Sequence, residues 1–79
     1  MQIKVIVKHW IYKSPPMGFK PPVIEYDYAQ EFFFTWENGI VKTNNWNKPV
    51  DTLEQCFKAI KGYFYGTHYD IIDFVKMND

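Results

Sequence analysis

Apolar and polar side chains alternate one by one between residues 23 and 37, and this is the most regular pattern in the chain. One side of the repeat is aromatic or aliphatic, and the other is acidic or carries a hydroxyl group. The apolar side comprises Ile24, Tyr26, Tyr28, Phe32, Phe34 and Trp36, and the polar side comprises Glu25, Asp27, Glu31, Thr35 and Glu37. A period of two residues is typical of a half-buried strand. The pattern therefore predicts one long strand with a single apolar face.

Asn38 and Gly39 follow this strand directly. Both residue types tolerate the positive φ angles of a two-residue type I′ turn. The chain then returns in a register that pairs Glu37 with Ile40 and Trp36 with Val41. The sequence thus predicts a β-hairpin whose outer face gathers Phe33, Ile40 and Trp46.

Residues 2 to 12 alternate in the same way and predict a second long strand. Its inner side comprises Ile3, Val5, Val7, His9 and Ile11, and its outer side comprises Gln2, Lys4, Ile6, Lys8, Trp10 and Tyr12. Pairing with the first strand would place its lysines opposite acidic residues, which stabilises an antiparallel pair. We therefore expect the two long strands to be neighbours.

The length of the strand over residues 23 to 36 conflicts with the size of the chain. About 14 residues at about 3.3 Å each reach about 46 Å, whereas a domain of this size is about 30 Å across. We expect a bulge at Ala29-Gln30, where a glutamine interrupts the apolar face. Without a bulge, the end from Trp36 to Val41 would project as a ribbon.

A helix is predicted after Asp51. Asp51 and Glu54 have the spacing of a capping box, and an apolar stripe follows with helical spacing at Leu53, Cys56, Phe57, Ile60 and Phe64. The helix is expected to end near Gly66. Residues 67 to 77 fit a strand or a helix capped by Thr67, and their β-branched and aromatic residues favour the strand.

These elements predict a single α+β domain over residues 1–79. We expect a small antiparallel sheet in β-β-β-α-β order with one helix packed on one face. The connector over residues 13 to 22 contains two diprolines, which flank Met17, Gly18, Phe19 and Lys20. Proline stiffens both flanks, so Met17 and Phe19 would either form an exposed tip or fold back over the core.

The composition narrows the possible functions. Aromatic residues make up 20% of the chain, the formal net charge is zero, and arginine is absent. No general basic field therefore favours nucleic acid, and the usual bidentate reader of phosphate and guanine is missing. The single cysteine excludes an internal disulfide and fits a reducing compartment. No apolar run approaches the roughly 20 residues of a membrane span, so a soluble cytoplasmic protein is expected.

Candidate catalytic and metal-binding residues are few. Cys56 could form a thiol-imidazole pair with His9 or His68, and Asp70 could orient the histidine. However, Cys56 lies on the apolar helical stripe, where thiols are usually inert. Histidine and cysteine lack the short spacings of zinc sites, and the glycines do not cluster as in a phosphate loop. The sequence therefore predicts no enzyme, no cofactor and no metal site.

The face of the sheet that the single helix leaves uncovered is the remaining candidate for function. We predict that it binds a protein through apolar side chains rimmed by balanced charge. The predicted contact residues are Trp10, Tyr12, Met17, Phe19, Phe33, Ile40 and Trp46. Alternatively, the proline-rich connector or the C-terminus covers this face, or the sheet dimerises through it.

The expected function is that of a small, non-enzymatic protein-binding module, either monomeric or homodimeric. A short, arginine-free chain without a catalytic site suggests a phage or mobile-element inhibitor that occludes a larger host protein or a defence complex such as a CRISPR system. A single-stranded nucleic-acid-binding protein is an alternative, because rings and lysines share the outer face. The acidic residues predicted on the same face would repel a phosphate backbone.

Overall fold

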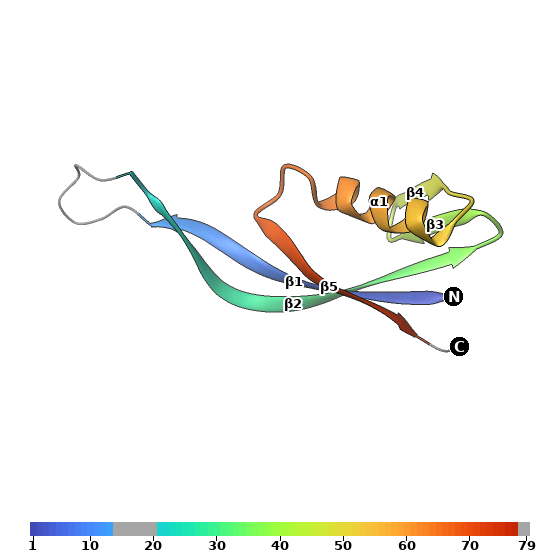
Figure 1. Ribbon diagram of the computed structural model, residues 1–79, viewed down its shortest axis with the longest axis horizontal. Helices are drawn as coiled ribbons and strands as arrows, with labels where there is room; N and C mark the ends of the chain where they lie inside the picture. Colours follow the sequence, from blue (N-terminus) through green and yellow to red (C-terminus); the bar gives the residue numbers. More distant parts are fainter. Residues whose placement is uncertain (14–20, 78–79) are drawn as a thin grey trace.

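The computed structural model describes residues 1–13 and 21–77 of the chain. They form a five-stranded antiparallel sheet in the order β4-β3-β2-β1-β5, with a single helix, α1, over one face (Figure 1). The elements are β1 (Gln2–Lys13), β2 (Val23–Glu37), β3 (Ile40–Thr43), β4 (Trp46–Pro49), α1 (Leu53–Phe64) and β5 (Tyr69–Met77). The predicted α+β class is confirmed, and the order of elements along the chain matches the predicted β-β-β-α-β order apart from the additional strand β4. The strand expected over residues 67 to 77 is also confirmed.

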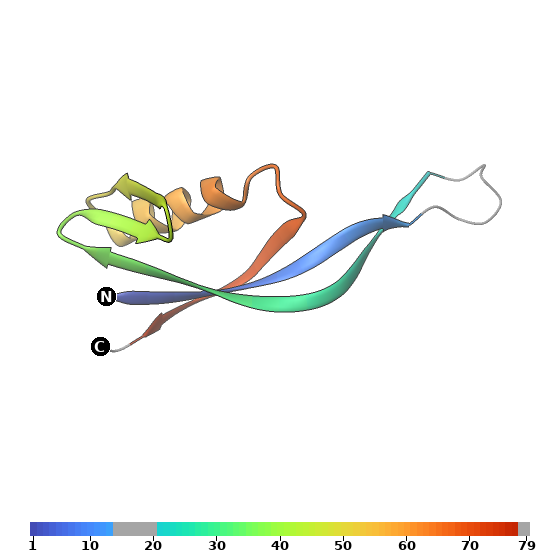
Figure 2. The same cartoon turned by 180° about the vertical axis from the view of Figure 1, so that it is seen from behind.

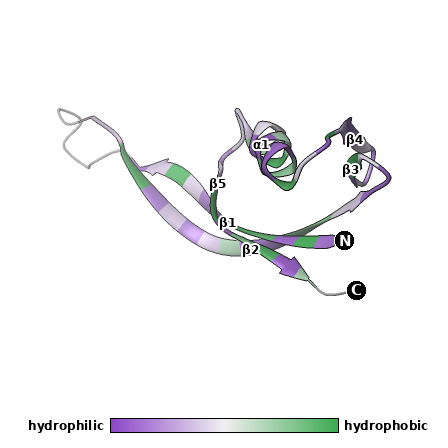
Figure 3. Ribbon diagram, turned by 45° about the vertical axis from the view of Figure 1, so that its right-hand side comes forward, coloured by the Kyte–Doolittle hydropathy of each residue, from purple (hydrophilic) through white to green (hydrophobic). Residues whose placement is uncertain are grey.

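The core lies between the sheet and α1. β1 runs through the sheet between β2 and β5 and contributes three fully buried residues, Ile3, Val5 and Val7. Phe34 from β2 and Ile60 from α1 close the core from either side. Figure 3 shows the hydrophobic side of α1 turned toward the sheet. The alternation read in the sequence thus selects the core residues correctly in this half of the molecule.

The turn between β2 and β3 follows the prediction. Asn38 and Gly39 have φ angles of 53° and 74°, and the register pairs Trp36 with Val41 and Glu37 with Ile40. The left-handed backbone of both residues fits the type I′ turn, whose twist matches that of the strands. The residues of the turn therefore predict the register of this hairpin correctly.

The placement of Trp46 on the outer face is wrong. A second tight turn at Asn44, whose φ is 46°, pairs Trp46 with Thr43 and begins β4. Residues directly opposite one another in an antiparallel pair point to the same face, so Trp46 lies on the face of Thr43 and of the buried Val41. The sequence prediction placed Trp46 on the opposite face because it continued the alternation of the preceding strand through the turn at Asn44.

The helix cap is also displaced by one residue from the prediction. Thr52, not Asp51, is the N-cap, and its Oγ1 accepts a hydrogen bond from the backbone N–H of Gln55 at 3.1 Å. The Gln55 side chain in turn accepts from the N–H of Asp51 at 2.9 Å. The helix ends as expected, with Gly66 at a φ of 78° just beyond it. No helix in the described part of the chain is long and apolar enough to span a membrane.

Beyond the core, β1 and β2 continue as a two-stranded ribbon (Figures 1 and 2). The last pair between β1 and β5 is His9 with Tyr69, so residues 10–13 of β1 and 23–27 of β2 extend past β5; we call these two segments, together with Tyr28 at their base, the arm. At its base, His9 pairs with Tyr28 and Trp10 pairs with Tyr26, which leaves Asp27 as an extra residue in a bulge. The bulge was expected at Ala29-Gln30 and is found two residues earlier, at Asp27. The end of β2 that projects is the one at Val23, not the Trp36 to Val41 end that was expected for a strand without a bulge.

Candidate interaction surface

The arm carries most of the large hydrophobic side chains that are exposed in the described residues. Five of the nine lie on it, with exposed fractions between 47% and 61%: Tyr12, Val23, Ile24, Tyr26 and Tyr28. Figure 3 shows hydrophobic segments on both of its strands. Tyr12, Ile24 and Tyr26 share one face of the arm, because Tyr12 pairs with Ile24 and Tyr26 pairs with Trp10. Apolar side chains gathered on an exposed surface often mark an interaction site. The arm is therefore the first candidate for a functional surface.

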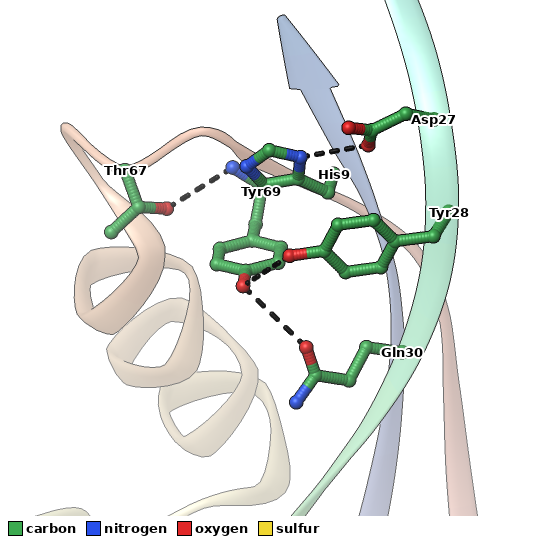
Figure 4. A network of polar contacts seen from close by, with 6 residues as sticks. All are labelled: His9, Asp27, Tyr28, Gln30, Thr67 and Tyr69. Carbon is green, nitrogen blue, oxygen red and sulfur yellow. Dashed lines mark hydrogen bonds and ion pairs between the residues drawn. The ribbon is translucent and has the colours of Figure 1, made fainter.

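The base of the arm is fixed by contacts between three strands (Figure 4). His9 Nδ1 lies 2.7 Å from Asp27 Oδ1, and the His9 ring stacks on Tyr28 at a centroid distance of 4.6 Å. The hydroxyl groups of Tyr28 and Tyr69 are 3.1 Å apart, and Tyr69 also donates to Gln30 Oε1 at 3.5 Å. This network ties β5 to β2 across β1, so the arm leaves the body at a defined angle.

Trp10 is held against the body by stacking. Its indole lies parallel to the His68 imidazole, with centroids 4.4 Å apart and an interplanar angle of 4°. Its backbone N–H donates to the carbonyl of His68 at 2.8 Å, and Tyr12 contacts its ring edge-on at 5.0 Å. Rings that are already ordered lose little conformational entropy when a partner binds. The arm is therefore suited to binding before any partner arrives.

Tyr26 connects the arm to the start of β5. Its hydroxyl donates a hydrogen bond to Asp70 Oδ2 at 2.7 Å, and this bond is the main reason that the pKa of Tyr26 is raised. The ring also lies 5.6 Å from Lys8 Nζ, within cation–π range. In the same region, the hydrogen bond with Tyr69 raises the pKa of Tyr28 to about 12. Both phenols therefore remain protonated hydrogen-bonding groups well above neutral pH.

Two lysines of β1 form ion pairs with acidic residues of β2. Lys13 Nζ is 3.3 Å from Glu25 Oε2, and Lys4 Nζ is 3.7 Å from Glu31 Oε1. The expected opposition of lysines and acids across the two strands is confirmed for Lys4 and Glu31. Because acidic groups accompany the cations along the ribbon, it does not present the continuous positive stripe that a nucleic-acid backbone requires.

The predicted contact residues do not form one surface. Phe33 and Ile40 are exposed on the body at 49% and 42%, whereas Trp10 and Tyr12 belong to the arm. Phe33 pairs with Lys4, six residues from Trp10 along β1, a separation of about 20 Å. Trp46 instead packs against Phe34 and Tyr63, with centroids 5.9 and 5.2 Å away. Met17 and Phe19 lie outside the described residues.

Sequence reasoning missed Ile24 and Tyr26 as surface residues because it assigned them to the apolar, core-facing side of β2. The bulge at Asp27 reverses the alternation, so Tyr26 pairs with Trp10 and shares its face. In addition, the arm extends past the core, which leaves its residues exposed on either face. The excess length of the strand was the signal that pointed to this outcome.

The thiol that was considered for catalysis lies in the core. Cys56 is fully buried, and burial raises the pKa of its thiol. A raised pKa lowers the fraction of thiolate, which is the nucleophilic form. Among the described residues, no group of three or more histidine, cysteine, aspartate or glutamate side chains could hold a metal ion.

Comparison with known proteins gives no match: no family model, no curated protein and no solved structure matches the chain.

Proposed function

We propose that the protein is a non-enzymatic protein-binding module that contacts its partner through the arm. The observation that carries this proposal is the set of five exposed apolar side chains on a ribbon that projects beyond the helix-covered body. A ribbon of this kind can enter a groove or a cleft on a larger protein, which a flat sheet face cannot do.

The chemistry of the arm supports a protein partner over a nucleic acid. Protein interfaces are enriched in tyrosine and tryptophan and are rimmed by polar groups. The arm offers Tyr12, Tyr26 and Tyr28 beside the ion pair of Lys13 with Glu25. Single-stranded nucleic acid would also stack on these rings, but it would meet Glu25 and Asp27 close to the same rings.

On this proposal, the protein acts by occluding a surface of a larger partner. The chain is short and contains no arginine, which suggests a phage or mobile-element inhibitor. We therefore place the partner among the host proteins or defence complexes, including CRISPR systems, that such inhibitors block. The single cysteine suggests that both meet in the reducing cytoplasm.

The experiment begins with affinity capture from host lysate, with and without nuclease, followed by binding assays with the purified partner. Tyr12→Ala and Ile24→Ala should each weaken binding at least tenfold, as expected for interface anchors, while circular dichroism shows the fold retained. Phe33→Ala is the matched control, because Phe33 is an equally exposed ring on the body, and it should leave affinity within about twofold.

Three outcomes would contradict the proposal. Arm variants that bind with normal affinity would exclude the arm as the contact surface. Capture that disappears after nuclease treatment would support the nucleic-acid alternative. A concentration-dependent dimer that dissociates in the Tyr12→Ala variant would show that the arm binds a second copy of the chain.

A further inference from the structure

β5 is an edge strand. Within residues 1–13 and 21–77 it pairs with β1 alone, and no strand lies along its outer edge. Thr67 Oγ1 accepts a hydrogen bond from the N–H of Tyr69 at 3.3 Å, which satisfies one backbone donor at the start of the strand. An open strand edge presents a row of backbone donors and acceptors that a further extended chain can pair with.

A groove runs alongside this edge, between β5 and the second half of α1. It consists of two adjoining hollows of about 460 and 380 Å³. Lys61 from α1 and Ile71 and Ile72 from β5 line both hollows, so the two form one continuous feature. Tyr65, 90% exposed, lies where α1 ends, and β5 begins a few residues farther along the chain (Figure 1). The groove therefore has an open strand as one wall and a helix as the other.

A bulge exposes an apolar side chain within this groove. Val7 pairs with Ile71 and Ile6 pairs with Asp73, which leaves Ile72 as the extra residue. Ile72 is 52% exposed. Bulges often protect an edge strand from aggregation, but this one also places a branched apolar side chain where an added strand would contact it.

We propose that this groove binds an extended, basic peptide segment of a partner protein, which adds to β5 as a sixth strand. An extended backbone is the occupant that pairs with an open edge, and a strand beside a helix is a recurring mode of peptide recognition. This site adjoins the arm at Tyr26, which lines the larger hollow, but strand addition at β5 goes beyond the function proposed for the arm.

Asp73 specifies a cationic side chain in the peptide. Asp73 pairs with Ile6 of the neighbouring strand β1 and makes no ion pair with the residues that the structure describes. A lysine or arginine opposite Asp73 would supply an opposite-charge cross-strand pair. The alternate side chains of the peptide would point toward α1 and contact Ile71, Ile72 and the alkyl stem of Lys61. The preferred peptide therefore alternates cationic and apolar residues.

A second copy of β5 fits the edge less well. β5 carries Asp70, Asp73 and Lys76. An antiparallel pair of two copies that set Asp70 opposite Lys76 would place the two Asp73 side chains opposite each other, and like charges in that position are unfavourable. A basic peptide faces no such repulsion.

The test uses fluorescein-labelled peptides of nine residues, the length of β5, with the full protein chain. The first peptide alternates valine and lysine, the second replaces lysine with glutamate, and the third carries N-methyl groups on the edge that would pair with β5. Fluorescence anisotropy should show the lysine peptide binding at least tenfold more tightly than either of the others. Amide NMR shifts on binding should concentrate in residues 61–77.

The variant Asp73→Lys should reverse the preference between the lysine and glutamate peptides, and it changes an exposed side chain that the core does not need. Tyr12→Ala should leave peptide binding unchanged, so failure of this site and failure of the arm proposal are distinguishable. Equal binding of the N-methylated peptide would overturn strand addition. An unliganded dimer that excludes the peptide would assign the edge to a second copy and would also overturn the proposal.

Discussion

His9 Nδ1 lies 2.7 Å from the Oδ1 atom of Asp27, the residue that bulges out of β2. The bulge leaves Asp27 without a partner residue in the ladder, and its carboxylate reaches back to the neighbouring strand. The side chains of His9 and Asp27 are 21% and 38% exposed, so water screens the contact in part. The extra residue therefore both redirects the strand and fixes the new direction.

Replacing Asp27 with asparagine should loosen the arm without unfolding the body. The amide retains an acceptor but loses the charge that strengthens the contact with His9, and we expect a cost of about 1 kcal/mol. Hydrogen exchange should show amides of residues 10–13 and 23–28 opening about fivefold more often, with core amides unchanged. Glu25→Gln is the control, because its pair with Lys13 is exposed and contributes about 0.5 kcal/mol or less. Equal effects of the two variants would show that the bulge contact has no special role.

The helix cap can be tested by comparing two adjacent residues. Thr52→Ala removes the Oγ1 acceptor of the Gln55 N–H and should lower the free energy of unfolding by about 1 kcal/mol. Asp51→Ala keeps the backbone N–H that donates to Gln55 and should cost about 0.5 kcal/mol or less. Urea denaturation followed by tryptophan fluorescence measures both. A larger loss for Asp51→Ala would restore the capping box read from the sequence.

The features that the sequence predicts well are those set by local chemistry. Asn38 and Gly39 determine the turn between β2 and β3, and the alternation of Ile3, Val5 and Val7 determines the buried face of β1. The features that it misses depend on partners distant in sequence. The bulge at Asp27 depends on pairing with His9 and Trp10, which no window of β2 reveals.

Only part of the candidate surface was predicted from the sequence, because simple alternation identifies a face only where no bulge or turn interrupts it. Tyr12 was identified because simple alternation holds in β1, whereas Tyr26 was assigned to the wrong face because alternation fails across the bulge. Trp46 was misplaced because the Asn44 turn reverses the face of the chain. One extra residue in a strand, or one unrecognised tight turn, exchanges core and surface positions for every residue beyond it.

Trp46 should now behave as a core residue. Trp46→Ala would remove its contacts with Phe34 and Tyr63, and we expect a loss of about 3 kcal/mol in the free energy of unfolding. Phe33→Ala is the matched control, because Phe33 is an exposed ring adjacent to Phe34 and should cost about 1 kcal/mol or less. Chemical denaturation distinguishes the two, and similar losses for both would place Trp46 on the surface after all.

Two tyrosines should make the protein sensitive to alkaline pH. The pKa values of Tyr26 and Tyr28 are raised in the fold, that of Tyr28 to about 12, whereas a tyrosine in an unfolded chain titrates near pH 10. A raised pKa means that the protonated form is favoured in the fold, so this stabilisation is complete below about pH 10 and is lost as pH rises through the folded value. The free energy of unfolding should therefore fall between about pH 10 and 12, and Tyr28→Phe should make that fall shallower because it removes the group that titrates.

Tyr65→Phe is the control variant, because it removes a phenol that is 90% exposed. Any effect of lysine titration in the same pH range is common to both variants. Absorbance at 295 nm would follow phenolate formation directly, and identical alkaline profiles for Tyr28→Phe and Tyr65→Phe would contradict a role for the Tyr28 hydroxyl in joining β2 to β5.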